Sequence, residues 1–169
     1  MRRLSAHFVF PVTSPPMKMG IICLDHAGTI TDIIDTKGCL KEREKVEFYN
    51  GILIPGLINV CKQNHVSSGS LLDKTVDKYI NTETPTDTQL YVFEKIKDIC
   101  QTVPNISLEQ LLYRVTWDAA KTLGLDKMQG SFEKGKKPGV SLISPVNYDP
   151  LFLTELSKIK ILIDRFPAR

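Results

Sequence analysis

Several residue types are scarce in this sequence, and each scarcity argues against a class of protein. Only three histidines and four cysteines occur among 169 residues, and no two cysteines form a Cys-x-x-Cys pair. A hydrolytic metal site usually needs several histidine and carboxylate ligands, so the histidine count argues against one. The wide cysteine spacing argues against a zinc finger and against a dense disulfide framework. We therefore predict reduced thiols in a cytoplasmic protein.

Long apolar runs and a strong imbalance of charge are missing as well. No stretch approaches the roughly 18 consecutive apolar residues of a membrane span, and residues 4–10 are too short and polar for the apolar part of a signal peptide. The net charge is only +3, and the basic cluster of Lys134, Lys136 and Lys137 is predicted to be a solvated surface. We therefore expect neither a membrane nor a nucleic acid as a partner.

The hydrophobic period of the sequence changes twice along the chain. Short runs rich in β-branched and aromatic residues predict strands at 4–10, 19–24, 29–34, 46–49, 52–54, 140–143 and 158–163. Residues 25–28 fit a hairpin turn, and residues 130–139 fit a turn-rich loop. Because strands at both ends flank a helical middle, we predict an α+β fold.

Three helices are predicted in the middle of the chain. The first spans residues 70–80, and the second begins near Thr86 in a capping box with Gln89 and stops before Pro104. The second carries an apolar stripe made of Leu90, Phe93, Ile96 and Cys100. The third helix begins at Ser107, forms a capping box with Gln110, and ends at Gly124. Its apolar stripe consists of Leu108, Leu111, Leu112, Val115, Ala119 and Leu123.

One segment has a sharper pattern than the rest. Residues 50–59, with the sequence NGILIPGLIN, place an apolar strand before a Pro-Gly turn and a second apolar run. This segment resembles the passage from a small β-sandwich into the catalytic barrel of amidohydrolase-superfamily enzymes. Residues 116–143 resemble the end of the same family pattern, with Thr116, Ala119-Ala120, Leu123-Gly124 and the Gly130–Lys136 loop before a strand. The resemblance implies a composite sandwich built from both chain ends.

The resemblance also implies a chemistry, from which this chain departs at the residues that would perform it. Family members use zinc or another divalent metal to hydrolyse or deaminate C–N bonds of small molecules. Their alternating histidine pair corresponds to Cys61 and Gln63 here, and the aspartate run corresponds to 81–83, with only Asp87 nearby. A later family aspartate corresponds to Gly139. We therefore predict no catalytic residue, no cofactor-binding residue and no metal ligand.

Length supports the same view. A complete (β/α)8 barrel takes about 250 residues, whereas this chain offers about 25 residues between the two matching segments. We predict a small composite β-sandwich from N- and C-terminal strands plus two or three helices left from a barrel. Its parts are residues 1–60, the first part of the sandwich; 61–124, a helical segment; and 125–169, the second part of the sandwich.

Other motifs have weaker patterns. Asp25 after an apolar run resembles the nucleophile of haloacid-dehalogenase phosphatases, but the second carboxylate of that signature is Ala27. Residues 130–136 have the Gly-x4-Gly-Lys spacing of a phosphate-binding loop, but Lys137 and Pro138-Gly139 replace the hydroxyl residue and the helix. His65 with Cys61 makes at most half of a metal site. A hairpin turn, a surface turn and ordinary loop residues explain these motifs as well.

Two functions of different classes follow from these observations. The first is an amidohydrolase-like protein that is truncated and inactive by itself. The alternative is a structural or oligomerisation module without catalysis, because helices that lack barrel neighbours leave apolar faces for a homo-oligomer. A phosphatase that uses Asp25 is the third hypothesis.

Overall fold

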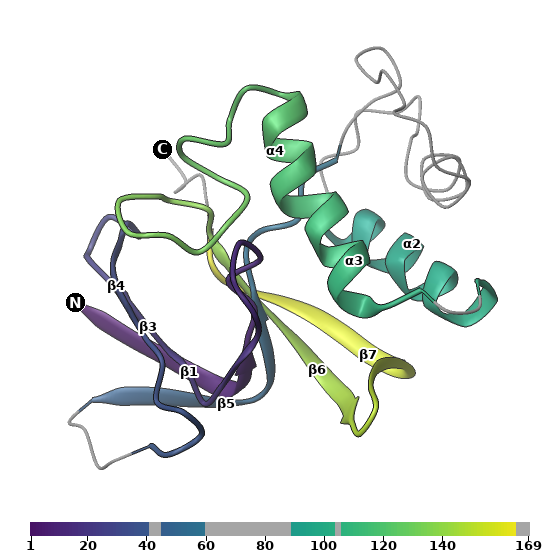
Figure 1. Ribbon diagram of the computed structural model, residues 1–169, viewed down its shortest axis with the longest axis horizontal. Helices are drawn as coiled ribbons and strands as arrows, with labels where there is room; N and C mark the ends of the chain where they lie inside the picture. The colour runs from purple at the N-terminus through teal and green to yellow at the C-terminus, as the bar shows by residue number, and fades with distance from the viewer. Residues whose placement is uncertain (41–44, 60–88, 104–105, 165–169) are drawn as a thin grey trace.

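The computed structural model describes residues 1–40, 45–59, 89–103 and 106–164. They form a mixed α+β fold in which one seven-stranded sheet is covered on one side by helices (Figure 1). The strands are β1 (Arg2–Val9), β2 (Met17–Lys18), β3 (Ile21–Leu24), β4 (Ile30–Ile34), β5 (Val46–Ile54), β6 (Val140–Tyr148) and β7 (Leu151–Ile163). The predicted helix at 70–80 lies outside the described residues.

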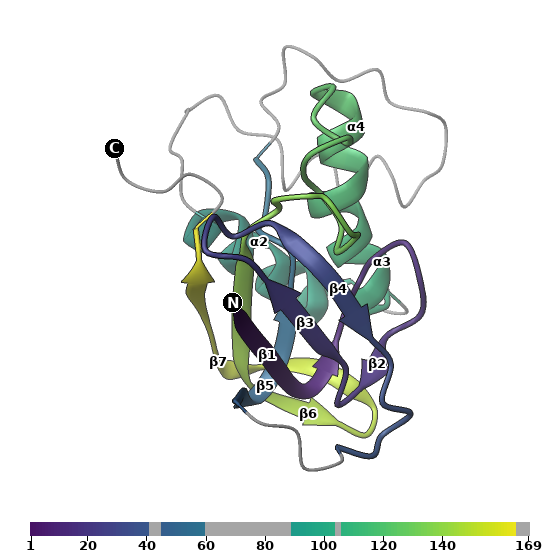
Figure 2. The ribbon, with the colours of Figure 1, turned by 90° about the vertical axis from the view of Figure 1, so that its left-hand side faces the viewer.

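Both ends of the chain contribute to this one sheet. Its strand order is β4-β3-β1-β5-β6-β7, and β2 pairs with β1 beside this path. The strands β1 and β5 pair in parallel, while β5 and β6 pair antiparallel with Ile52 opposite Ile143. Figure 2 shows β5 and β6 crossing the middle of the sheet, between the N-terminal strands and β7. The central pair of strands, β5 and β6, therefore joins residues about 90 positions apart in sequence.

The second half of β5 is buried on both faces, and its side chains alternate between two hydrophobic cores. Ile52 and Ile54 point to the helix side, where they meet Ile143 of β6. Leu53 points to the other side, where it meets Leu142. The first group is called the helix-side core, and its buried members are Phe10, Ile52, Ile54, Leu57, Val92, Phe93, Ile96, Ile99, Leu108, Leu111, Leu112, Val115, Ile143, Val146 and Leu153.

The second group is called the loop-side core. It lies where the N-terminal strands β1, β3 and β4 curl towards β6, and Phe132 of the 125–139 loop closes it (Figure 1). Its buried members are Leu4, Ala6, Val9, Ile22, Leu24, Ile30, Leu53, Phe132, Val140 and Leu142. The strand β4 is attached to the same loop, because the Ile30 N–H donates to the Lys136 carbonyl and the Gly135 N–H to the Ile30 carbonyl.

The helices pack against the helix-side core and, through Ala119 and Ala120, against Ile58 in a small third cluster. They are α2 (Gln89–Thr102), α3 (Leu108–Tyr113), the π-helical turn η2 (Arg114–Asp118) and α4 (Ala119–Thr122), the last three in direct succession. The predicted capping box is confirmed, because the Ser107 hydroxyl accepts from the Gln110 N–H and the Gln110 side chain accepts from the Ser107 N–H. Gly124 ends this helix in a left-handed conformation, as predicted.

The apolar stripe predicted for the second helix is wrong in part. Phe93 and Ile96 are fully buried, but Leu90 is 57% exposed, and Cys100 is half-buried. The inward face instead adds Val92 and Ile99 to Phe93 and Ile96. Leu90 lies at the edge of this buried face and points to solvent. The sequence pattern alone does not show which side of the helix the sheet covers.

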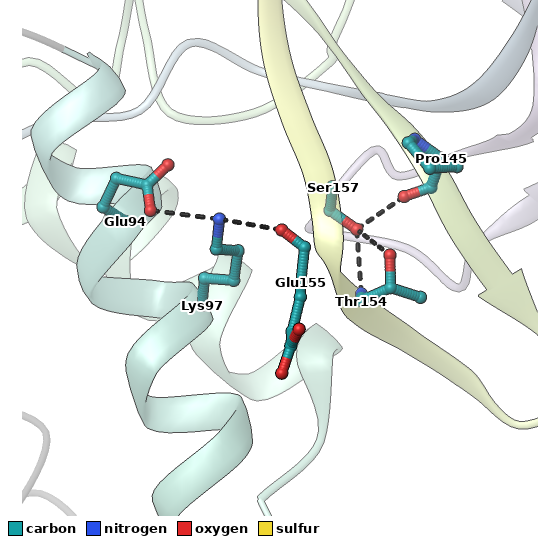
Figure 3. Close-up of polar contacts among 6 residues, drawn as sticks. All are labelled: Glu94, Lys97, Pro145, Thr154, Glu155 and Ser157. Carbon is teal, nitrogen blue, oxygen red and sulfur yellow. Dashed lines mark hydrogen bonds and ion pairs between the residues drawn. The ribbon is translucent and has the colours of Figure 1, made fainter.

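The C-terminal strands are longer than predicted. They continue through residues 144–157 as a hairpin that contains an irregular bulge, because residues 154–157 of β7 lie between its pairs with Val146 and Ser144. The buried Ser157 hydroxyl holds this bulge by accepting from the Thr154 N–H at 2.8 Å and donating to the Pro145 carbonyl (Figure 3). Lys97 of α2 then donates to the Glu155 carbonyl, so the helix is fastened to the bulge.

The strand predicted at 19–24 begins later, at Ile21, because Met19 has a left-handed backbone conformation with φ of 51°. The strands predicted at 46–49 and 52–54 form the single strand β5, which runs through Gly51. A side chain at Gly51 would lie 2.3 Å from the Ile143 carbonyl, so only glycine lets β6 approach here. Within the described part of the chain, no helix has the length and apolar character needed to cross a membrane.

Candidate functional site

The residues that the resemblance placed at a metal site belong to a part of the chain that the structure does not describe. Cys61, Gln63, His65 and Asp87 lie outside the described residues. Among residues 1–40, 45–59, 89–103 and 106–164, no three His, Cys, Asp or Glu side chains are grouped so that they could hold a metal ion. Gly139 lies directly before β6 in a left-handed turn conformation.

Asp25 lies in the turn between β3 and β4, as the hairpin interpretation predicted. One oxygen of its carboxylate accepts from the Ala27 N–H at 2.8 Å and from the Thr29 N–H at 2.9 Å. The hydrogen bond from Thr29, and then that from Ala27, lowers the pKa of Asp25. This is the geometry of an Asx turn, in which the carboxylate shapes the hairpin.

The loop with phosphate-binding spacing does not have the structure of a phosphate-binding loop. Such a loop leads into a helix whose N–H groups face the phosphate, whereas β6 begins at Val140. Its lysine is also engaged: Lys136 Nζ lies 2.7 Å from a Glu133 carboxylate oxygen and 2.9 Å from Ser131 Oγ. The ammonium group also lies 4.2 Å from the centre of the Trp117 ring.

The prediction that Lys136 belongs to a solvated surface is therefore wrong. Its residue is only 8% exposed, and Ser131 is fully buried. The hydrogen bond from Lys136 to Glu133 lowers the pKa of Glu133 below its ordinary value, because the ammonium group stabilises the carboxylate. Because Ser131 and Glu133 lie in the loop and Trp117 lies in η2, these contacts of Lys136 tie the loop to the helix.

The two segments that carry the resemblance, residues 50–59 and 116–143, meet at a junction in the structure. The Gly56 N–H donates to the Pro138 carbonyl at 3.1 Å, and the Ile58 N–H donates to the Val115 carbonyl at 2.8 Å. The Pro-Gly turn thus contacts both the C-terminal loop and the last helix. A side chain at Gly56 would lie 2.7 Å from the Pro138 oxygen, so the turn needs a glycine for this close approach.

Gln89 is the buried polar residue at this junction. Its amide oxygen accepts from the Leu57 N–H at 3.2 Å and from the Ser141 hydroxyl at 2.7 Å. The capping box predicted for this side chain has its other member, Thr86, outside the described residues. Within the described residues, the Gln89 oxygen joins the Pro-Gly turn to β6. A buried amide with two distant partners fixes the start of α2 against the sheet. Only a three-dimensional contact reveals this role.

A second polar group joins β1, β5 and β6 at the far end of the sheet. The Tyr148 hydroxyl donates to Asn50 Oδ1 at 3.1 Å and lies 3.1 Å from His7 Nδ1. A hydroxyl has one proton, so the contact with His7 requires a proton on Nδ1. Burial raises the pKa of Tyr148. His7 also contacts the ring of Phe48, and the group acts as a cross-link between strands.

The family resemblance has no support from comparison with known proteins. No family model matches this chain, and no curated protein matches it significantly. The resemblance to amidohydrolases therefore stays a prediction from the sequence segments quoted above.

Proposed function

We propose that this chain is a reduced amidohydrolase-like protein that retains the architecture of the family without its chemistry. In this proposal the N- and C-terminal strands are the two halves of a composite sandwich. The helices α2 and α3–α4 are those left from the barrel. Its function is to provide a folded scaffold, and hydrolysis of C–N bonds requires residues that this chain lacks.

The observation that carries the proposal is the junction around the Pro-Gly turn. Residues 50–59 and 116–143 carry the resemblance. The Gly56 N–H donates to Pro138 of the second segment, and the Ile58 N–H donates to Val115 directly before it. Gly130 adds a third close approach, since a side chain there would lie 2.5 Å from Ala120 Cβ. Small residues are expected at such close contacts, because only glycine and alanine fit there. We infer that these positions of the family pattern serve the fold.

Metal content tests the proposal. We would purify the full chain without a chelator, measure zinc and manganese by elemental analysis, and titrate both metals by calorimetry. We expect less than about a tenth of an equivalent of bound metal and no tight binding in either titration, because a hydrolytic site needs several ligands with an open position. One tightly bound metal per chain would overturn the proposal.

A second candidate function, homo-oligomerisation, is favoured by large apolar side chains on the helices. Leu90 of α2 is 57% exposed, and Tyr113 of α3 is 42% exposed. Burial of such residues in a subunit interface gains about 1.5–3 kcal/mol for each large side chain. We expect the mass measured by light scattering to rise with concentration, and Leu90→Ser to reduce that rise.

The matched control is Leu156→Ser, which removes an exposed leucine of β7, 73% accessible, from the bulge instead of the helices. It should leave the association unchanged. A monomer at every concentration, or an equal effect of both variants, would exclude the helix faces as the interface.

A further inference from the structure

The helix that runs from α3 to α4 contains the π-helical turn η2 between them (Figure 1). In an α-helix each N–H donates to the carbonyl four residues back, so the Ala119 N–H would donate to Val115. Here it donates to the carbonyl of Arg114, five residues back, and to that of Thr116. The Val115 carbonyl is thereby left available to a donor from outside the helix.

That donor is Ile58, which follows the Pro-Gly turn. Its N–H donates to the Val115 carbonyl at 2.8 Å, and its buried side chain packs against Ala119 and Ala120. A buried backbone N–H needs a hydrogen-bond partner, whereas a carbonyl inside a regular α-helix is already engaged by the N–H four residues on. The π-helical turn therefore supplies the acceptor that fastens Ile58 to the helix.

Other contacts of η2 depend on the register of the helix. The Trp117 ring is contacted by two ammonium groups, with Lys136 Nζ at 4.2 Å and Lys121 Nζ at 5.1 Å from its centre. A side chain at Gly130 would lie 2.9 Å from the Thr116 carbonyl oxygen, so the loop backbone rests on this turn. One residue of helical register corresponds to a rotation of about 100°. A change of register would therefore move Trp117 relative to the loop.

The π-helical and α-helical registers of this turn differ by few hydrogen bonds. Without Ile58, the Val115 carbonyl is free to accept from the Ala119 N–H, as in a regular α-helix. The Ile58 N–H would then bond to water, and exchanging one protein hydrogen bond for one to water changes the free energy only modestly. Because π-helical turns are rare in comparison with α-helical ones, the α-helical register is expected once Ile58 has left.

We propose that η2 is a register switch, in which the hydrogen bond from Ile58 holds the π-helical form. While Ile58 donates to Val115, the Ala119 N–H donates to Arg114. When Ile58 leaves, the Ala119 N–H takes the Val115 carbonyl and the turn becomes α-helical. The switch couples the Pro-Gly turn after β5 to Trp117 and to the 125–139 loop. This inference is independent of the family resemblance and of the proposed scaffold function.

The test identifies the donor that the Val115 carbonyl accepts. Scalar couplings across hydrogen bonds, between an amide nitrogen and a carbonyl carbon, are measured on the full chain labelled with ¹⁵N and ¹³C. We expect the carbonyl carbon of Val115 to couple to the nitrogen of Ile58 in the unmodified chain. A coupling of Val115 to the nitrogen of Ala119 in its place would show that the turn is already α-helical and would overturn the proposal.

Two changes at position 58 separate the hydrogen bond from the side chain. Incorporation of the α-hydroxy acid analogue of isoleucine turns the amide into an ester, which removes the N–H and keeps the side chain. We expect the Val115 carbonyl carbon then to couple to the nitrogen of Ala119, and the fluorescence of Trp117 to change. Ile58→Ala is the matched control, because it keeps the N–H and removes the side chain from Ala119 and Ala120.

The control should keep the coupling between the amide at position 58 and the Val115 carbonyl. Far-UV circular dichroism establishes that both altered proteins keep their helices. If the ester shows no coupling between Ala119 and Val115, the hydrogen bond from Ile58 does not hold the register. If Ile58→Ala shows that coupling as well, the side chain holds the register instead. Either result would overturn the proposal.

Discussion

The two hydrophobic cores lie on opposite sides of β5 and β6, and they are closed in different ways. The helix-side core is covered by α2 and α3, whose buried side chains recur at helical spacing. The loop-side core is closed by a single aromatic residue, Phe132, which belongs to an irregular loop. Backbone hydrogen bonds and the Lys136 network hold that loop in place.

This difference explains which contacts can be read from sequence. A helical stripe is a periodic pattern, so regular burial can be predicted from it without knowing the partner. A loop has no period, and its contacts depend on where the rest of the chain lies. We therefore expect the stability of the helix-side core to depend on the apolar volume that it buries. We expect the stability of the loop-side core to depend also on a few polar contacts that hold the loop.

The largest expected effect comes from removing apolar volume on the helix side. Phe93 is fully buried, so Phe93→Ala should lower the free energy of unfolding by about 3–5 kcal/mol, measured by chemical denaturation. Leu90→Ala on the same helix is the control, because Leu90 is 57% exposed and should cost less than about 0.5 kcal/mol. Similar losses for both variants would contradict the observed orientation of α2.

The next effect concerns the junction, where the two ends of the chain meet. A methyl group at Gly56 would lie 2.7 Å from the Pro138 carbonyl oxygen. Gly56→Ala should therefore destabilise the protein by about 1–3 kcal/mol, because the loop or the turn must move. A thermal unfolding series measures this loss. An unchanged or higher melting temperature would show that the turn and the C-terminal loop are not in contact.

A smaller effect is expected from the polar attachment of the loop-side core. Lys136→Met keeps the aliphatic stem and removes the ammonium group from Glu133, Ser131 and Trp117. We expect a loss of about 1–2 kcal/mol in denaturant unfolding and a changed fluorescence of Trp117, the only tryptophan. Lys134→Met, at an exposed position of the same loop, is the control and should change neither. Equal stability and equal fluorescence of the two variants would show that Lys136 is solvated like Lys134.

The smallest effect is on the pH dependence of the same loop. The pKa of Glu133 lies below its ordinary value of 4.5 because Lys136 donates to it. The ion pair therefore stabilises the folded state above about pH 4.5, and this contribution disappears as the pH falls through the lowered pKa. Glu133 is 40% exposed, so solvent screening keeps the energy small.

We expect Trp117 fluorescence to change below pH 4.5 while the far-UV circular dichroism of the helices stays constant. This separation would show the loop side loosening before the helix side. Simultaneous change of both signals would mean that the two cores respond as one.

Sequence alone predicted the regular half of this structure. The α+β class, most strand positions and the capping box of Ser107 with Gln110 follow from period and capping chemistry, and the structure confirms them. The burial of Lys136 could not be predicted, because its three partners come from an irregular loop and a helix. The contacts of Gln89 with positions 57 and 141 could not be predicted for the same reason, since these partners are distant in sequence.

The sequence resemblance implied a composite sandwich built from both chain ends. The structure shows strands from both ends in one sheet, whose pairing of β5 with β6 joins residues about 90 positions apart. The most direct measurement of this central claim is a nuclear Overhauser spectrum of the labelled full chain. The structure predicts cross-strand contacts that join Ile52 to Ile143, Leu53 to Leu142 and Ile54 to Ser141. Contacts in another register, or none between residues 52–54 and 141–143, would contradict a sheet composed from both ends of the chain.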